Sequence, residues 1–315
     1  MLLDLADHNP CPAGAKLALL TTADGVLLRT ACWSPPHAQR GTVLLLQGRA
    51  EMIEKYFETI AELLQKGFAV IAFDWRGQGG SQRLLSDPMK GHIGSFDDYQ
   101  TDLDAVLHHY HAQLQKPVLL LAHSMGGLIA MEALARRPHL TRAVVLSAPM
   151  FGIHVLQKQL WLKALIKLLC LFGFKTREPP MHRSQSPFTM AYTRNPLTRD
   201  QRRFERMKAI LNAQARLAVG MPTLGWLNEA LKAMNGLSKN PSALKHNNHP
   251  PITIFLPRAD RVTATPLTRH VCASHATMAL IEIDDSEHEV FMESDLVRAQ
   301  VWAVIEDTVL PLFPA

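Results

Sequence analysis

Residues 118–127 read VLLLAHSMGG, an apolar run that leads directly into a small-x-Ser-x-Gly turn. A helical pattern of apolar residues follows at once, from Leu128 to Leu134. This order of strand, sharp turn and helix is the layout of a nucleophile elbow, which holds a serine hydroxyl at the carboxyl end of a strand. The stretch therefore predicts Ser124 as a nucleophile. The alternative is a buried serine in a tight turn without a chemical role.

Strand and helix patterns alternate around this stretch. We predict strands at 16–22, 26–33, 42–47, 68–74, 117–123 and 143–147, with helices over 51–66 and 96–113. Strand patterns return at 252–256 and 280–283, and a last helix is predicted over 295–309. Alternation at this spacing is typical of βαβ units. The predicted fold class is therefore α/β, with a mostly parallel sheet flanked by helices.

The segment 152–245 breaks this rhythm, because it has helical patterns and no convincing strand. We interpret it as a helical cap, or lid, inserted into a core formed by 1–151 and 246–315. The segment carries sixteen Lys or Arg and four Asp or Glu, in a chain of net charge +5. Such a basic segment suits an anionic lipid surface or a phosphate-bearing substrate. We find no nucleic-acid-binding motif and expect no nucleic-acid partner; a merely solvated helical surface is the alternative.

Composition limits the class of protein and its compartment. The 315 residues are 47% hydrophobic and 19% charged, which is typical of a globular chain with a sizeable core. Four cysteines are widely spaced, which argues against a disulfide framework or a zinc site and favours a reducing compartment. We find no signal peptide and no membrane-spanning apolar run. We expect a cytoplasmic protein, with at most a peripheral contact to the inner membrane face; the oligomeric state stays open.

A serine nucleophile needs a base within hydrogen-bond reach, and that base needs an orienting carboxylate. In this layout the acid and the histidine follow the serine in chain order, each in a loop after a strand. Asp260 follows the predicted strand at 252–256, and His288 follows the one at 280–283. We predict His288 as the general base and Asp260 as its acid. A turn-capping aspartate and a surface histidine are the alternatives.

An oxyanion hole requires two backbone N–H groups aimed at the developing alkoxide. We predict that Met125, at the start of the elbow helix, supplies one and that Arg49, after the strand at 42–47, supplies the other. Gly48 is predicted to bind substrate, because glycine lets the backbone approach it closely. The alternative is a glycine turn without function.

The first cap helix is predicted over 154–174. Gln159, Lys163 and Lys167 recur every four residues as one polar stripe, and nearly everything else is apolar. We predict that Trp161 and Leu165 line a tunnel for an acyl chain, and that the apolar face can also touch a membrane. A helix buried between cap and core is the alternative.

Several segments together resemble one family. LLLQGRAEMIEKYFETIAELL is similar to the HGxxEH…Y segment of monoglyceride lipases and bacterial lysophospholipases of the α/β-hydrolase fold, and FDWRGQGGSQR to their DxRGxGxS loop. LAHSMGG resembles their GHSMGG elbow, RADRV their acid loop and DSEHEVFME their histidine loop, while GMPTLGWLNEAL is similar to a cap segment of the bacterial branch. The resemblance implies a serine hydrolase of lipid esters. It carries the catalytic and oxyanion roles onto Ser124, Asp260, His288, Met125 and Arg49.

The expected reaction is hydrolysis of carboxylic esters of single-chain lipids, a lysophospholipid or a monoacylglycerol, through an acyl-enzyme and without cofactor or metal. A general short-chain carboxylesterase or thioesterase is the alternative enzyme, and a non-catalytic lipid-binding protein on the same fold is the alternative class. A proline aminopeptidase is disfavoured because the cap shows no acidic cluster suited to an amine. Gln47 and Ala122 depart from the family's His and Gly, which can alter the shape of the oxyanion loop.

Overall fold

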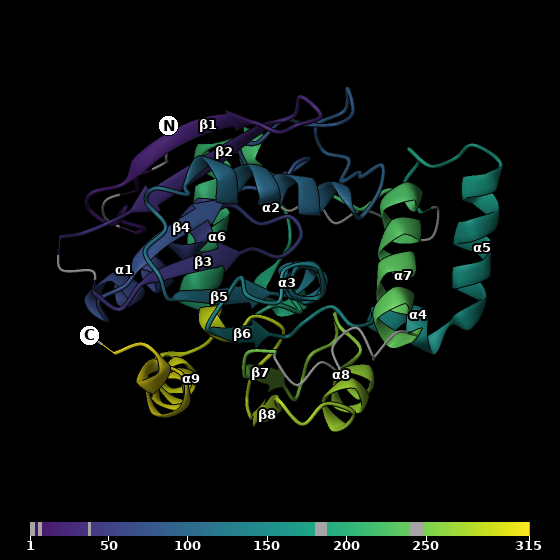
Figure 1. Cartoon of the computed structure of the whole chain (residues 1–315). Coiled ribbons are helices and arrows are strands. Elements are labelled where there is room, and N and C mark those ends of the chain that lie inside the picture. Colours follow the sequence, from purple (N-terminus) through teal and green to yellow (C-terminus); the bar gives the residue numbers. More distant parts are fainter. Residues whose placement is uncertain (1–3, 6–7, 37–38, 180–187, 240–248, 315) are drawn as a thin grey trace.

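One twisted sheet forms the centre of the molecule (Figure 1). The structure is a computed structural model and describes residues 4–5, 8–36, 39–179, 188–239 and 249–314. Within these ranges eight strands pair in the order β1-β2-β4-β3-β5-β6-β7-β8. The pairs β1–β2 and β2–β4 are antiparallel and all the others are parallel. The strands are β1 Lys16–Thr21, β2 Leu27–Trp33, β3 Thr42–Leu46, β4 Ala69–Phe73, β5 Val118–His123, β6 Ala143–Ser147, β7 Ile252–Pro257 and β8 Met278–Ile283.

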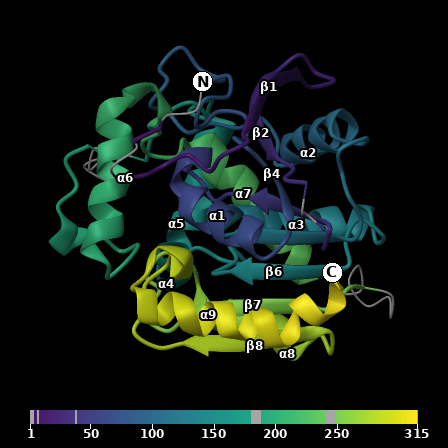
Figure 2. The same ribbon diagram turned by 90° about the vertical axis from the view of Figure 1, so that its left-hand side faces the viewer.

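Helices cover both faces of the sheet because its central strands are apolar on both sides. Alternate residues of β3 enter separate cores: Val43 and Leu45 join one, and Leu44 and Leu46 join the other. The first core is closed by α1 (Phe57–Gln65) and α9 (Asp295–Thr308), and Figure 2 shows α9 running alongside β7 and β8. The second is closed mainly by α2 (Asp98–His109), α3 (Met125–Arg136) and α8 (Thr265–Ala273).

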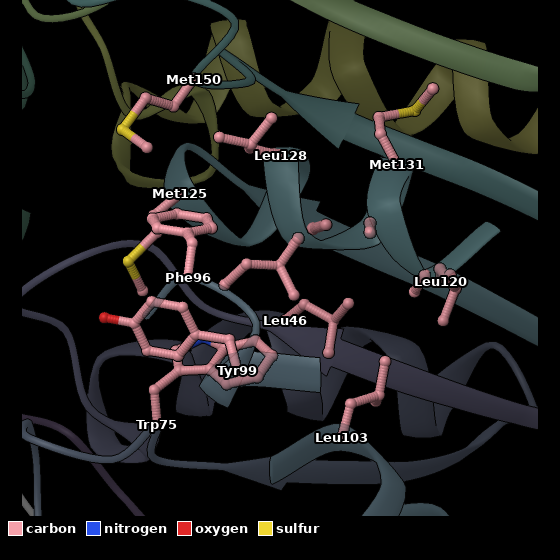
Figure 3. Close-up of a cluster of buried hydrophobic side chains, with 14 of the residues drawn as sticks. Leu46, Trp75, Phe96, Tyr99, Leu103, Leu120, Met125, Leu128, Met131 and Met150 are labelled. Carbon is pink, nitrogen blue, oxygen red and sulfur yellow. The ribbon is translucent and has the colours of Figure 1, made fainter. Parts of the chain in front are cut away.

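The second core contains the helix that follows the predicted elbow. Leu128 and Met131 of α3 belong to the same buried cluster as the sheet residues Leu46 and Leu120 (Figure 3). Trp75 packs edge-on against Tyr99, with ring centroids 5.5 Å apart, beneath Met125. The start of α3 is therefore anchored in a fully buried cluster, which holds the turn before it in one position.

Between β6 and β7 the described residues form the helices α4 His154–Lys158, α5 Leu160–Leu171, α6 Gln201–Ala213 and α7 Leu224–Lys239. Figure 1 shows α5 beside α7, away from the sheet. The predicted cap limits stay a prediction, and the boundary between 245 and 246 lies outside the described residues. No described helix is both long enough and apolar enough to cross a bilayer.

Two predicted helices were wrong in extent. The one over 154–174 is broken at Gln159, whose backbone is not helical (φ −126°, ψ 76°). The break lets the His154 N–H donate to the Val262 carbonyl at 3.0 Å, next to the core, while α5 packs on α7. The helix predicted over 51–66 begins only with a 3₁₀ turn at Ile53–Tyr56, because the preceding loop folds back on itself. The apolar periodicity of a segment does not reveal the contacts with other parts of the chain that interrupt or shorten its helix.

Candidate active site

Ser124 occupies the sharp turn between β5 and α3. Its backbone has φ 50° and ψ −115°, a strained conformation for a residue with a side chain. The surrounding backbone holds it there, because its N–H donates to Ser147 at 2.9 Å and its carbonyl accepts from Gly127 and Met150 at 2.9 Å. Any side chain at Gly126 would overlap the Leu46 carbonyl, since a Cβ there lies 2.2 Å from that oxygen. The small residues of the turn therefore have a steric cause.

His288 and Asp260 meet Ser124 at the carboxyl edge of the sheet. His288 Nε2 lies 3.0 Å from Ser124 Oγ, and His288 Nδ1 lies 2.9 Å from Asp260 Oδ2. Asp260 follows β7 and His288 follows β8, so neighbouring strands deliver the two side chains to one point. The structure thus brings together the three residues that the sequence singled out.

Asp260 is held as an oriented anion. Its carboxylate accepts hydrogen bonds from the N–H groups of Val262 at 2.7 Å and Thr263 at 3.0 Å, and from the Thr263 hydroxyl at 2.5 Å. Burial opposes its charge, but His288 and these donors outweigh burial and lower its pKa to about 2. Asp260 Oδ1 accepts from the two backbone N–H groups, and Oδ2 faces His288. The bonds that form the turn therefore do not compete with the bond to His288.

His288 is buried next to that anion. Burial by itself disfavours the imidazolium, but the Asp260 carboxylate, with the charges of Glu289 and Glu51, raises the pKa of His288 above the ordinary histidine value. A histidine with one nitrogen on a carboxylate and the other on a serine hydroxyl can accept the serine proton and stabilise the charge that results.

The loop after β3 holds Arg49, one of the two residues whose backbone N–H groups are the predicted oxyanion donors. The Gly48 N–H donates to the Glu51 carboxylate, and the Ala50 N–H donates to Gln78 at 3.1 Å. Within the described ranges, neither the Arg49 N–H nor the Met125 N–H donates to a protein acceptor. Two uncommitted N–H groups beside a serine hydroxyl are what an oxyanion hole requires.

A buried ion cluster next to this loop was missed by the sequence interpretation. Lys55 forms ion pairs with Glu51 and, at 2.6 Å, with Glu289, which follows His288 in the chain. Tyr56 donates its hydroxyl to Glu51 at 2.6 Å. The cluster therefore ties the loop after β3 to the loop that carries His288. The spacing of Glu51 and Lys55, four residues apart, was the available signal.

The same cluster is the strongest candidate for a metal site in the described part of the chain. Glu51, His123 and Glu289 offer ligand atoms within 4.8 Å of one another. The Lys55 ammonium, however, pairs with both carboxylates and so occupies the place of a cation. The group fits an internal ion pair better than a metal centre.

Ser124 and His288 open into a cavity of about 540 Å³. Much of its wall is apolar, because residues of α5, α6 and α7 face into it. Two of the three predicted substrate-binding residues, Gly48 and Leu165, line it, but Trp161 does not: its side chain is 55% exposed on another face of α5. Trp161 lies about 100° around the helix from Leu162, which does line the cavity. The apolar wall consists mainly of Leu162, Leu165, Ile166, Leu169, Phe204, Met207, Leu211, Leu224 and Trp226.

The two residues that depart from the family pattern, Gln47 and Ala122, lie beneath the site and not in the cavity wall. Gln47 donates to Asp74 at 3.3 Å, and Trp75 donates to the Gln47 carbonyl at 2.9 Å. Asp74 also accepts from Arg29 at 2.7 Å, so it orders the loops beneath the site. Ala122 is buried at the end of β5. None of these side chains reaches the cavity wall.

Known proteins resemble this chain over most of its length. Residues 37–295 match the family described as serine aminopeptidase S33. Lysophospholipase L2 of Escherichia coli K12 is 28% identical over 306 residues, which cover 92% of this chain and 86% of that protein. A probable lysophospholipase L2 of Haemophilus influenzae is 30% identical over 268 residues, or 85% and 83% of the two chains.

The same fold occurs in a crystal structure of a soluble variant of monoglyceride lipase from Saccharomyces cerevisiae, in complex with a substrate analog. The TM-score is 0.74 at 18% identity, and the match covers 96% of this chain and 97% of that one. The predicted α/β fold class is confirmed by this likeness and by the sheet order. The chain is a serine hydrolase of the α/β-hydrolase fold and belongs to the family described as serine aminopeptidase S33.

Proposed function

We propose that this protein hydrolyses the carboxylic esters of single-chain lipids, with Ser124, His288 and Asp260 as its catalytic triad. The observation that carries the proposal is the continuous hydrogen-bonded chain from Asp260 through His288 to Ser124, which opens into an apolar-walled cavity. A lysophospholipid or a monoacylglycerol offers both parts that such a site needs: an ester for the serine and an alkyl chain for the wall.

In the proposed mechanism, Ser124 Oγ attacks the ester carbonyl carbon while His288 Nε2 takes the hydroxyl proton. The N–H groups of Met125 and Arg49 donate to the oxyanion, and Asp260 stabilises the imidazolium. His288 then gives its proton to the leaving alcohol, which leaves an acyl-serine. A water molecule loses a proton to His288 and attacks the carbonyl carbon of the acyl-serine. The bond from that carbon to Ser124 Oγ then breaks, His288 returns the proton to Oγ, and the fatty acid is released.

The cavity also argues against an amine substrate. Its acidic lining residues in the described part of the chain are Glu51 and Glu289, and both pair with Lys55. An aminopeptidase needs a carboxylate free to bind the substrate's ammonium group. The proposed activity is therefore that of an ester hydrolase rather than of a peptidase.

The decisive experiment measures fatty-acid release from a long-chain lysophospholipid and a monoacylglycerol, beside a short-chain p-nitrophenyl ester. We expect the lipids to be preferred and Ser124→Ala to lower kcat on the order of 10⁶-fold. Cleavage of the short ester alone would favour the carboxylesterase or thioesterase alternative. No cleavage, together with no labelling of Ser124 by a fluorophosphonate, would favour a binding protein.

We further propose that the outer face of α5 rests on an anionic membrane surface. Large apolar side chains are exposed along α5 and just beyond it, and Lys163 and Lys167 lie on the same helix. Exposed apolar residues beside lysines are typical of helices that lie in a membrane interface. The exposed residues are Leu160, Trp161, Leu168, Leu171, Phe172 and Phe174.

Vesicle binding tests the membrane contact. Making Lys163 and Lys167 both Glu should weaken binding to phosphatidylglycerol vesicles, because each lysine near an anionic surface contributes about 1 kcal/mol. Hydrolysis of a water-soluble short ester should stay the same in that variant. Equal vesicle binding by the variant and the unchanged protein, or none by either, would contradict the contact.

A further inference from the structure

One cation in the cavity, the Arg49 guanidinium, lacks a carboxylate partner among the residues that the structure describes. Of the four basic side chains that line the cavity in the described part of the chain, Lys55, Arg203 and Lys208 lie within 4.0 Å of a carboxylate oxygen, and Arg49 does not. The fully buried basic residues elsewhere in the described ranges are also paired. These pairs are Arg29 with Glu54 and Asp74, Arg76 with Asp102, and Arg298 with Glu62.

The Arg49 guanidinium is nevertheless held in one place. Its Nη1 donates to the Gly220 carbonyl at 2.9 Å, and its Cζ lies 5.6 Å from the centre of the Trp226 ring. Gly91 leaves room for it, because a Cβ there would lie 2.8 Å from Nη1. No other side-chain N–H of Arg49 donates to a protein acceptor within the described ranges. The group is thus positioned and keeps most of its five donors available.

Arg83 provides a comparison, because the hydrogen-bond donors of its guanidinium have protein acceptors. Like Arg49 it is half-buried and forms no ion pair, but all three of its nitrogens donate to backbone carbonyls. Arg49 has one such bond, and it is one of the residues that line the cavity. Burial lowers the pKa of Arg49 to about 10, which still leaves it charged at neutral pH. An enclosed charge without a partner costs free energy that an anionic ligand would offset.

We propose that the Arg49 guanidinium binds the phosphate diester of a lysophospholipid whose acyl ester lies at Ser124. This inference rests on the proposed function and selects one of its two lipid classes. The backbone N–H of the same residue is the proposed oxyanion donor, so one residue contacts both polar ends of the glycerol unit. In Arg49, the same number of bonds separates the backbone nitrogen from the guanidinium carbon as separates the acyl carbonyl carbon from phosphorus in a 1-acyl lysophospholipid. A planar guanidinium also suits two phosphate oxygens at once.

The test compares Arg49→Gln with the unchanged protein on lysophosphatidylcholine and monoacylglycerol of the same acyl chain. The substitution keeps the backbone N–H and removes the charge. We expect kcat/KM for the lysophospholipid to fall about ten- to hundredfold more than that for the monoacylglycerol. Arg202→Gln is the matched control, because it removes an arginine that is 67% exposed on α6. Arg202→Gln should leave kcat/KM unchanged for both substrates.

Monoacylglycerol hydrolysis reports whether the loop still supports catalysis. An equal fall on both lipids in Arg49→Gln, or no change on either, overturns the phosphate site while leaving the proposed function in place. If the unchanged protein cleaves neither lipid, the proposed function fails and this inference fails with it. Inorganic phosphate separates a headgroup site from a site for the free ion. If Arg49→Gln removes inhibition by free phosphate but leaves lysophospholipid hydrolysis unchanged, the site takes the ion itself, and the headgroup assignment is wrong.

Discussion

The two walls of the cavity are built in different ways. On the sheet side, Ser124, His288 and Glu51 come from loops far apart in the sequence, and each has specific hydrogen-bond partners. On the opposite side, α5 contributes leucines, whose side chains are apolar. Chemistry at an ester needs atoms placed within a fraction of an ångström, whereas an alkyl chain needs only apolar area and space. We therefore expect substitutions in the two walls to change different kinetic quantities.

The largest effect should come from the orienting carboxylate of the polar wall. Asp260→Asn keeps the size of the side chain but favours the wrong tautomer of His288, so kcat should fall on the order of 10⁴-fold. Steady-state kinetics with a short ester and with a long-chain lipid should show the same loss. A larger loss on the lipid than on the short ester would contradict a purely chemical role.

The polar wall also predicts the direction of the pH dependence. His288 must be neutral to accept the serine proton, and its pKa is raised above the ordinary value of 6.5. Activity should therefore fall as the pH drops through that raised pKa, by about tenfold per pH unit. Because the charge of Glu289 contributes to the rise, Glu289→Gln should move this acid limb to lower pH. An acid limb that lies at or below 6.5, or that does not move, would contradict the assignment.

Glu51 tests whether the oxyanion loop depends on its buried anchor. Glu51→Gln weakens the acceptor of the Gly48 N–H and one partner of Lys55, so the Arg49 N–H should lose its fixed direction. We expect kcat to fall about ten- to hundredfold with little change in KM. Glu62→Gln is the matched control, because Glu62 pairs with Arg298 away from the cavity. A similar fall in both variants would indicate general destabilisation.

Substitutions in the apolar wall should change how the activity depends on the length of the acyl chain. Leu165→Trp fills cavity space, so kcat/KM for a long-chain lipid should fall about tenfold while a short ester is unaffected. Leu168→Trp changes the same helix on its exposed face and should leave both activities unchanged. Parallel assays of the two variants with acyl chains of increasing length would measure the difference. Equal effects of the two substitutions would remove the distinction between the faces of α5.

Much of the polar wall could be predicted because its signals are local. The strand, turn and helix around Ser124 are encoded in one short stretch, and Asp260 and His288 each follow a recognisable strand. Parallel strands place their carboxyl ends at one edge, so three separate loops were expected to meet. The apolar wall was harder to predict. The periodicity of α5 marked it as apolar nearly all round, but did not show that Leu165 faces inward and Trp161 outward.

The sequence by itself determined the alternation of strands and helices, the position of the elbow and the order of the three triad residues, because short-range patterns encode them. Only the tertiary structure decided the break at Gln159, the ion cluster around Lys55 and, among the described residues, the lack of a carboxylate partner for Arg49. These features depend on which distant segments come into contact. A charge has a partner or lacks one only once the chain has folded around it.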